Sequence, residues 1–439
     1  MTRFARRDLI RCGLAAGGAL MAAPIARLFA QPGAAEDRRL VACYFSGGWD
    51  VLLGPDAQEP TARNGIGRLD GPARYKTPFP VTLGGREVLW GGPMRALAEH
   101  ADLTTCFRGV NMNTVSHPTG RAYVVSMKQP AGTVVRGNAL GTVFASGGQL
   151  EGEGAPALPN VAIGMQSTNV DYDLAASAVQ IDRPNEIAYL IDAPRPDRTL
   201  PATVEQLLAE AQDESESCIS DRHAGSPVGG LELSRERLRR LQRDRVAERF
   251  AFDADTPEMV ALRNRYFGGG PPRQGAQMQA AVAAQLLRTG LSRSVSIKLQ
   301  RGLDTHFGNW VTDQAPRLEE GFDALGALLS DLREDDPGLE RTTVIAFSEF
   351  SRQAFLNPKL GRDHWFANSF LVFGSLLTPG VFGATDGELG LRKVDLVTGR
   401  PEGSGTIIKP EHVFATVVKA AGLDWTEYRV DALDAWIRS

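Results

Sequence analysis

Residues 342 to 352 read Thr-Thr-Val-Ile-Ala-Phe-Ser-Glu-Phe-Ser-Arg. The first six, Thr342–Phe347, are apolar or β-branched and are bounded by polar sequence, which predicts a short buried strand. Glu349 follows almost directly where that strand ends. In open α/β sheets, ligand sites lie outside the carboxyl ends of the parallel strands. The stretch therefore predicts a buried parallel sheet with functional side chains at its carboxyl edge.

The rest of the chain alternates between apolar strand-like runs and amphipathic helical runs. We predict further strands at residues 40–45, 103–110, 188–191, 295–299 and 369–373. Apolar positions spaced by three and four predict helices at residues 203–211, 234–249, 257–266, 275–289 and 318–332. This alternation predicts an α/β fold, a doubly wound and mostly parallel sheet with helices on both faces. We expect a single domain over residues 36–439, with a helical insertion at about 203–290 beside the sheet.

The N-terminal segment has the pattern of an export signal. Arg6 and Arg7 form a twin-arginine pair, and residues 12–26 carry no charge and are rich in Ala and Gly. A run of this length is too short for a comfortable membrane span. We therefore predict a twin-arginine signal over residues 1–35 and a periplasmic or secreted mature protein, with an uncleaved N-terminal anchor as the alternative.

Composition narrows the class of partner. The chain is 43% apolar, which is enough to fill a sizeable core. Beyond residue 35 there are 43 basic against 51 acidic residues, so no nucleic-acid partner is expected. Residues 366–385 carry no charge but include Gly374 and Pro379. They predict a buried strand and turn, and we expect no transmembrane helix in the mature chain.

Acidic and histidine side chains follow several of the predicted strands. Three of the six histidines, His117, His306 and His364, fall near such positions. Asp304 and His306 are two residues apart, so in an extended segment both point to one face and can reach one ion. Oxygen and imidazole donors without thiolate suit Zn, Mn, Mg or Ca. We predict a site for one or two such divalent ions, with the ligands Asp50, Asp304, His306, Glu349, Asp363 and His364; the alternative is a set of polar groups satisfied in a core or cleft.

Ser116 lies in a turn after the second predicted strand and before a predicted apolar run. A serine there is either a helix N-cap or a nucleophile activated beside a cation. Arg121, Arg352 and Arg362 are candidate clamps for a phosphate- or sulfate-like group, or else salt-bridge partners. The sequence has no Gly-x-Ser-x-Gly elbow and no nucleotide-type phosphate loop, which argues against those two enzyme classes.

Several of these segments together resemble a known family. The segments are the twin-arginine start, Phe45-Ser46-Gly47-Gly48-Trp49-Asp50, Asp304-Thr305-His306, Phe347-Ser348-Glu349-Phe350-Ser351-Arg352, Gly361-Arg362-Asp363-His364-Trp365 and Val381-Phe382-Gly383-Ala384-Thr385-Asp386. The chain is similar over residues 40–435 to the domain of unknown function 1501 (DUF1501) family, in the alkaline phosphatase/sulfatase-like superfamily. The resemblance implies a large alkaline phosphatase-like α/β domain with a metal site at its strand ends.

The resemblance also implies a reaction, the hydrolysis of a phosphate or sulfate ester of a small molecule or glycan. Its carried-over roles place Asp50, Glu349 and Ser116 on one ion and a second group on the other, namely Asp304, His306 and His364. The chain differs from the superfamily pattern at Glu349-Phe350, where Asp-His is usual, and at Arg121, which comes one residue late. The alternative function is a non-catalytic cell-envelope protein of the same fold that binds a partner or a glycan.

Overall fold

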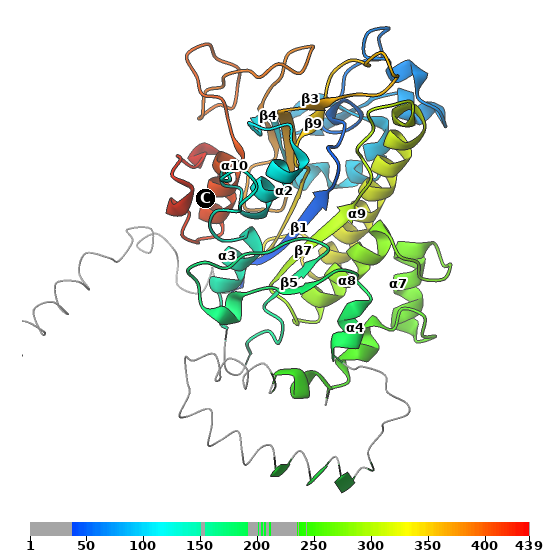
Figure 1. Cartoon of the computed structure of the whole chain (residues 1–439), viewed down its shortest axis with the longest axis vertical. Coiled ribbons are helices and arrows are strands. Elements are labelled where there is room, and N and C mark those ends of the chain that lie inside the picture. The colour runs from blue at the N-terminus through cyan, green and yellow to red at the C-terminus, as the bar shows by residue number, and fades with distance from the viewer. Residues whose placement is uncertain are drawn as a thin grey trace, which may run out of the picture.

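The computed structural model of the 439-residue chain describes residues 37–150, 154–191, 201, 203–204, 206–207, 210–211, 235, 237–242 and 244–438. The predicted export signal, much of the predicted helices at 203–211 and 234–249, and Cys218 lie outside the described residues. Figure 1 shows the described chain as a central sheet flanked by helices.

The central sheet has eight strands among the described residues, in the order β12-β4-β11-β8-β1-β7-β5-β6. Their bounds are β1 Arg39–Phe45, β4 Thr104–Asn111, β5 Asn160–Ile163, β6 Val179–Ile181, β7 Ser294–Gln300, β8 Thr342–Phe347, β11 Ala367–Phe373 and β12 Gly380–Gly383. β1 pairs in parallel with β7 and β8, and β5 pairs in parallel with β6 and β7. Only β11 runs against its neighbours, β8 and β4. The predicted mostly parallel sheet is confirmed. Its strands are apolar on both faces, so both faces must be covered.

Helices cover the two faces of the sheet, which confirms the predicted doubly wound α/β architecture. On one side α8 (Ala276–Arg288) and α9 (Ala315–Asp335) pack on β7. On the other side α3 (Leu140–Ser146) contacts β1, β5 and β7, and α10 (Pro410–Ala420) contacts β4 (Figure 1). The buried apolar side chains accordingly form two cores, one under each helical layer.

The remaining elements are smaller and complete the outline of the domain. They are α2 (His117–Ser126), α4 (Glu186–Ile191), α7 (Pro257–Phe267), the hairpin of β2 (Phe79–Leu83) and β3 (Arg86–Trp90), and the pair β9 (Ser351–Arg352) and β10 (His364–Trp365). The predicted helices at 257–266, 275–289 and 318–332 are confirmed as α7, α8 and α9. Because α8 packs directly on β7 and α9, this part of the predicted insertion belongs to the layer that covers the sheet.

Five of the predicted strands are confirmed, and one is wrong. Residues 188–191 belong to the helix α4. Ile187 and Ile191 are buried while Tyr189 and Leu190 between them are exposed, which is helical spacing and not strand alternation. The apolar composition of so short a run did not distinguish the two structures.

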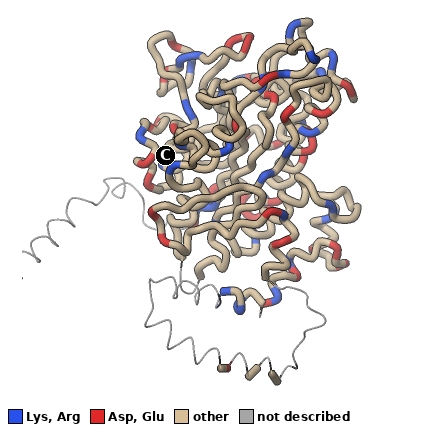
Figure 2. Tube along the Cα trace, viewed as in Figure 1, with Lys and Arg blue, Asp and Glu red and all other residues tan. Residues whose placement is uncertain are grey.

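The described residues contain no helix long and apolar enough to cross a membrane. Residues 366–385 hold β11 and a turn, as predicted, followed by β12, which was not predicted. Cys43 and Cys106 are buried free thiols. Acidic and basic residues are interspersed along the described chain in Figure 2.

Candidate metal centre

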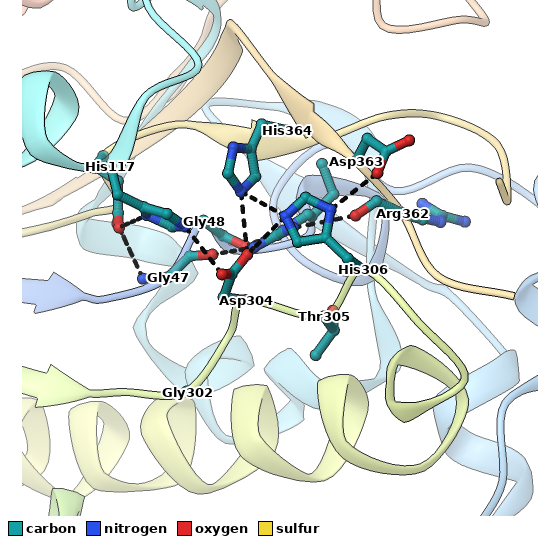
Figure 3. A network of polar contacts seen from close by, with 12 residues as sticks. Gly47, Gly48, His117, Gly302, Asp304, Thr305, His306, Arg362, Asp363 and His364 are labelled. Atoms are coloured by element: carbon teal, nitrogen blue, oxygen red, sulfur yellow. Dashed lines mark hydrogen bonds and ion pairs between the residues drawn. The ribbon is translucent and has the colours of Figure 1, made fainter. Parts of the chain in front are cut away.

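Three segments of the chain bring their side chains together at the carboxyl edge of the sheet. Asp304 and His306 lie in the segment that follows β7, and His117 is the first residue of α2, which follows β4. β10 pairs antiparallel with β9, and this pairing sets His364 opposite Arg352 just beyond β8. Figure 3 shows the three imidazoles arranged around the Asp304 carboxylate.

The Nε2 atoms of all three histidines point at Asp304. His364 Nε2 and His306 Nε2 each lie 3.0 Å from Asp304 Oδ1, and His117 Nε2 lies 3.2 Å from Oδ2. His306 Nε2 and His364 Nε2 are also 2.8 Å from each other. The ligand atoms of His117, Asp304 and His364 lie within 4.8 Å of one another.

The other nitrogen of each ring is held by an acceptor. His117 Nδ1 lies 2.9 Å from Glu349 Oε1, and His306 Nδ1 lies 2.8 Å from Asp363 Oδ1. His364 Nδ1 lies 2.7 Å from the carbonyl oxygen of Val115. Carboxylates and carbonyls only accept, so each Nδ1 carries a proton, and in its neutral form each ring presents a lone pair at Nε2. This is the arrangement in which proteins present histidine to a metal.

The residues present fit a bound cation. Two unprotonated Nε2 atoms at 2.8 Å cannot hydrogen-bond to each other, and the Asp304 carboxylate beside them is a further acceptor. A cation among them satisfies all these lone pairs at once. Ligands at the Zn–N distance of a tetrahedral site lie roughly 3.3 Å apart, close to the separations seen here. Three imidazoles and one carboxylate are donors that favour Zn.

Electrostatics keep these groups in the forms that bind metal. Burial lowers the pKa of His364, so its neutral imidazole is favoured. Burial alone would raise the pKa of Asp304, but the hydrogen bond and the positive charge of Arg352 bring it well below its usual range. Asp304 is therefore ionised and His364 is uncharged near neutral pH.

Glu349 supports the centre through His117. It is fully buried, and its carboxylate accepts from Gly47 N at 2.9 and 3.1 Å and from the Ser348 hydroxyl at 3.0 Å, in addition to His117. Burial would raise its pKa, but the hydrogen bond from His117 lowers it. Gly47 has φ of +117°, and a Cβ there would lie 2.7 Å from the backbone nitrogen of Asp304. Only glycine permits this close approach.

Asp50 is brought to a different partner. It forms a fully buried ion pair with Arg362 at 3.0 Å, and it accepts from the Trp310 indole at 2.8 Å. The Arg362 guanidinium stacks over the Trp310 ring, 4.4 Å from the ring centroid. The structure thus places Asp50 against Arg362 and not within the histidine cluster.

Arg352 is buried and fully engaged. It donates to the carbonyl oxygens of Gly47, Gly48 and Arg362 and, at 2.6 Å, to Asp304 Oδ1. Arg352 therefore positions Asp304. Because its guanidinium already donates to these four acceptors, it is not available to bind a phosphate or sulfate group.

The remaining predicted residues lie at the rim. Asp363 is half exposed and orients His306. Ser116 and Arg121 are exposed. Ser116 occupies the N-cap position of α2, but its hydroxyl makes no capping hydrogen bond. Among the described residues the Ser116 hydroxyl makes no hydrogen bond to Asp50 or Glu349, whereas the resemblance implied that these three residues share one ion.

His117 is the member of the cluster that the predicted ligand set omitted. Its signal was present in the sequence, as a histidine directly after the candidate nucleophile at the start of a helix. The residue type and the helix start were visible, but the direction of the ring was not.

The family model described as a protein of unknown function (DUF1501) matches residues 92–439. The chain belongs to the DUF1501 family. The matched range contains every residue of the histidine cluster. No curated protein matches the chain.

The solved structures that are weakly similar to this chain include the following two. One is titled Ps i-CgsB in complex with k-i-k-neocarrahexaose, with 8% identity, a TM-score of 0.38, and coverage of 91% of this chain and 75% of that one. The other is the lipoteichoic acid synthase LtaP from Listeria monocytogenes, with 10% identity, a TM-score of 0.33, and coverage of 89% and 74%.

Proposed function

We propose that this protein is a divalent-metal-dependent hydrolase of phosphate or sulfate esters, acting on a small molecule or a glycan. The observation that carries the proposal is the convergence of three Nε2 lone pairs, each fixed by an Nδ1 hydrogen bond, on the carboxylate of Asp304. The resemblance to the alkaline phosphatase/sulfatase-like superfamily supports the reaction class.

The proposed centre holds one ion, and Zn is the ion that its donors favour. Its ligands are His117, Asp304, His306 and His364. Asp50 is neutralised by Arg362, and Glu349 is used to orient His117, so neither is free to build a second site. We therefore propose one ion, where the sequence predicted one or two.

When bound, such an ion polarises the ester oxygens and stabilises negative charge that develops on them. Ser116 is the proposed nucleophile, because its exposed hydroxyl precedes His117 and is not used to cap α2. The hydroxyl gives up its proton and its oxygen forms a bond to phosphorus or sulfur as the ester bond breaks, and the leaving oxygen takes up a proton. Water then opens the covalent intermediate. Arg121, one helical turn beyond His117, is the residue that we propose holds the anionic group.

The test is an ester-hydrolysis screen of the Zn-loaded wild type and of Ser116→Ala, over phosphate and sulfate monoesters and diesters. We expect Ser116→Ala to lose turnover and to keep its Zn content and melting temperature, because the hydroxyl makes no cap bond. Ser404→Ala, an exposed serine in a distant loop, is the control. Full turnover in Ser116→Ala would remove the nucleophile assignment. A wild type that binds Zn but turns over none of these esters would favour the non-catalytic alternative, a protein that binds a partner or a glycan.

We also propose periplasmic or secreted localisation by twin-arginine export, on the strength of Arg6 and Arg7. Replacing both with lysine should retain the precursor in the cytoplasm, as measured by cell fractionation. Unchanged export of that variant would contradict the twin-arginine route.

A further inference from the structure

Thr305 stands between two of the proposed metal ligands, and its side chain points away from the metal centre (Figure 3). Asp304 and His306 on either side of it point into the centre, as alternate residues of an extended segment do. Thr305 is fully buried, whereas Asp304 is exposed and His306 is half-buried. The interior contacts of Thr305 therefore set the direction in which its two neighbours face the ion.

Gln314 holds the Thr305 side chain in the interior. In the amide orientation that satisfies its neighbours, Gln314 Nε2 donates to the Thr305 hydroxyl at 2.7 Å and to the Leu303 carbonyl oxygen at 3.2 Å, and Oε1 accepts from Asp50 N at 3.1 Å. Gln314 is fully buried, so any displacement would leave polar groups without partners in the interior. It ends the π-helical turn η8 (Trp310–Gln314), which leads into α9. Such turns are rare and occur frequently at functional sites.

The support closes into a ring through Asp50 and Arg362. The Asp50 carboxylate accepts from the Trp310 indole at 2.8 Å and pairs with the Arg362 guanidinium at 3.0 Å. The backbone N–H of Arg362 donates to the Thr305 carbonyl oxygen at 3.1 Å. Each of these side chains is fully buried. We call the set the buried ring, and its members are Asp50, Thr305, Trp310, Gln314 and Arg362.

The buried ring joins the segments that carry three of the four proposed ligands. Asp304 and His306 flank Thr305, and His364 lies two residues beyond Arg362. The Nε2 atoms of His306 and His364 face each other at 2.8 Å, so the lone pairs of the neutral rings repel until a cation binds between them. A rigid support is needed to keep these ligands in the binding geometry, and the buried ring is connected to both segments.

We propose that Thr305 and Gln314 are positioning residues of the metal centre. Through the buried ring they fix Asp304 and His306 in the geometry that binds the ion, and ion binding in turn stabilises η8. The second effect follows from the first, because coupling between two sites is reciprocal. The proposal rests on the proposed metal centre and names the interior groups on which its affinity depends.

The first test compares two buried threonines. Thr305→Val keeps nearly the same shape and removes the hydroxyl. Thr416→Val is the matched control, because Thr416 is equally buried in α10 and its hydroxyl donates to the His412 carbonyl oxygen at 2.6 Å and accepts from Leu433 N at 2.9 Å. We expect both variants of the full chain to lose stability in chelator, but only Thr305→Val to lose about 10–100-fold in Zn affinity by chelator competition. Thr305→Ser retains the hydroxyl and should recover most of that affinity.

Amide hydrogen exchange over residues 310–315 is the second readout. Zn should slow exchange there in the wild type and in Thr416→Val, and this Zn-dependent slowing should shrink in Thr305→Val. A structural role alone would change exchange equally with and without Zn. Gln314→Met removes the amide at the other end of the same hydrogen bond, so it should behave like Thr305→Val and stays informative if that variant fails to fold.

Wild-type Zn affinity and wild-type exchange in both Thr305→Val and Gln314→Met would overturn the proposal and leave the metal centre standing. A wild type that binds no Zn would remove the metal centre and this proposal together. Lowered Zn affinity in the two variants, with no ester turned over by the wild type, would leave the positioning role standing and reject the hydrolase.

Discussion

Replacing His364 with phenylalanine should separate the metal site from the stability of the fold. The His364 ring packs on Phe350, with ring centroids 4.3 Å apart, and a phenyl ring keeps that contact. The variant loses the bond from Nδ1 to the Val115 carbonyl, which is worth about 0.5–1.5 kcal/mol. It also removes the lone pair that faces His306 Nε2 at 2.8 Å. These two effects oppose each other, so we expect the metal-free variant to match the metal-free wild type within about 1 kcal/mol.

The Zn-loaded proteins should differ clearly. With free Zn at about 100 times the wild-type dissociation constant, the metal stabilises the wild-type fold by about 2.7 kcal/mol. If loss of one ligand weakens binding by about 100-fold, the same Zn concentration stabilises the variant by only about 0.4 kcal/mol. The Zn-dependent gain in stability should therefore almost disappear.

Two quantities are measured, the stability of the metal-free protein and its gain in stability with Zn. Both come from thermal and denaturant unfolding in chelator and in buffered Zn, together with the Zn content. His100→Phe is the control, because His100 is buried against Gly326 and Arg333, away from the cluster. That variant should lose stability equally with and without Zn and keep the Zn-dependent gain. If His364→Phe retains the full wild-type gain in Zn, the ligand assignment and the lone-pair reasoning behind it are both refuted.

Three further predictions address neighbouring groups. Glu349→Gln removes the carboxylate that orients His117, so Zn affinity should fall by about 10–100-fold in a chelator competition, and unchanged affinity would count against this role. Asp50→Asn leaves Arg362 buried without its partner and should cost about 3–5 kcal/mol in denaturant unfolding, with Zn stoichiometry unchanged in the folded fraction. Loss of Zn at unchanged stability would instead return Asp50 to the ligand set. Partial burial, and then repulsion from a neighbouring glutamate, raise the pKa of Asp323 to about 6. A raised folded-state pKa destabilises the fold as pH rises through that value, so Asp323→Asn should be more stable than the wild type at pH ~7.5, by less than about 1 kcal/mol because the group is partly solvated, and should lose this advantage by pH ~4. An equal advantage at both pH values would contradict the prediction.

The strands that sequence reasoning located are the ones that must be apolar on both faces. Runs such as Thr342–Phe347 lie in the middle of the sheet. Every residue of such a run is buried, so every position is apolar or β-branched. β5 and β12 have four residues each and were not predicted, because so short a segment carries too little periodicity to recognise. Residues 188–191 were assigned to a strand for the same reason.

The sequence by itself determined the sheet's character and the edge that bears the site, because burial and periodicity are local properties that a single chain displays. It also determined that the side chains of Asp304 and His306 lie together, since two residues of extended chain set them on one face. Only the tertiary structure decided which other groups join them. Asp50 and Arg362 are separated by 312 positions and His117 and Glu349 by 232, and at the sheet edge all these carboxylates were equivalent candidates. The choice follows from which loop packs against which, and from the requirement that each buried charge meet an opposite one.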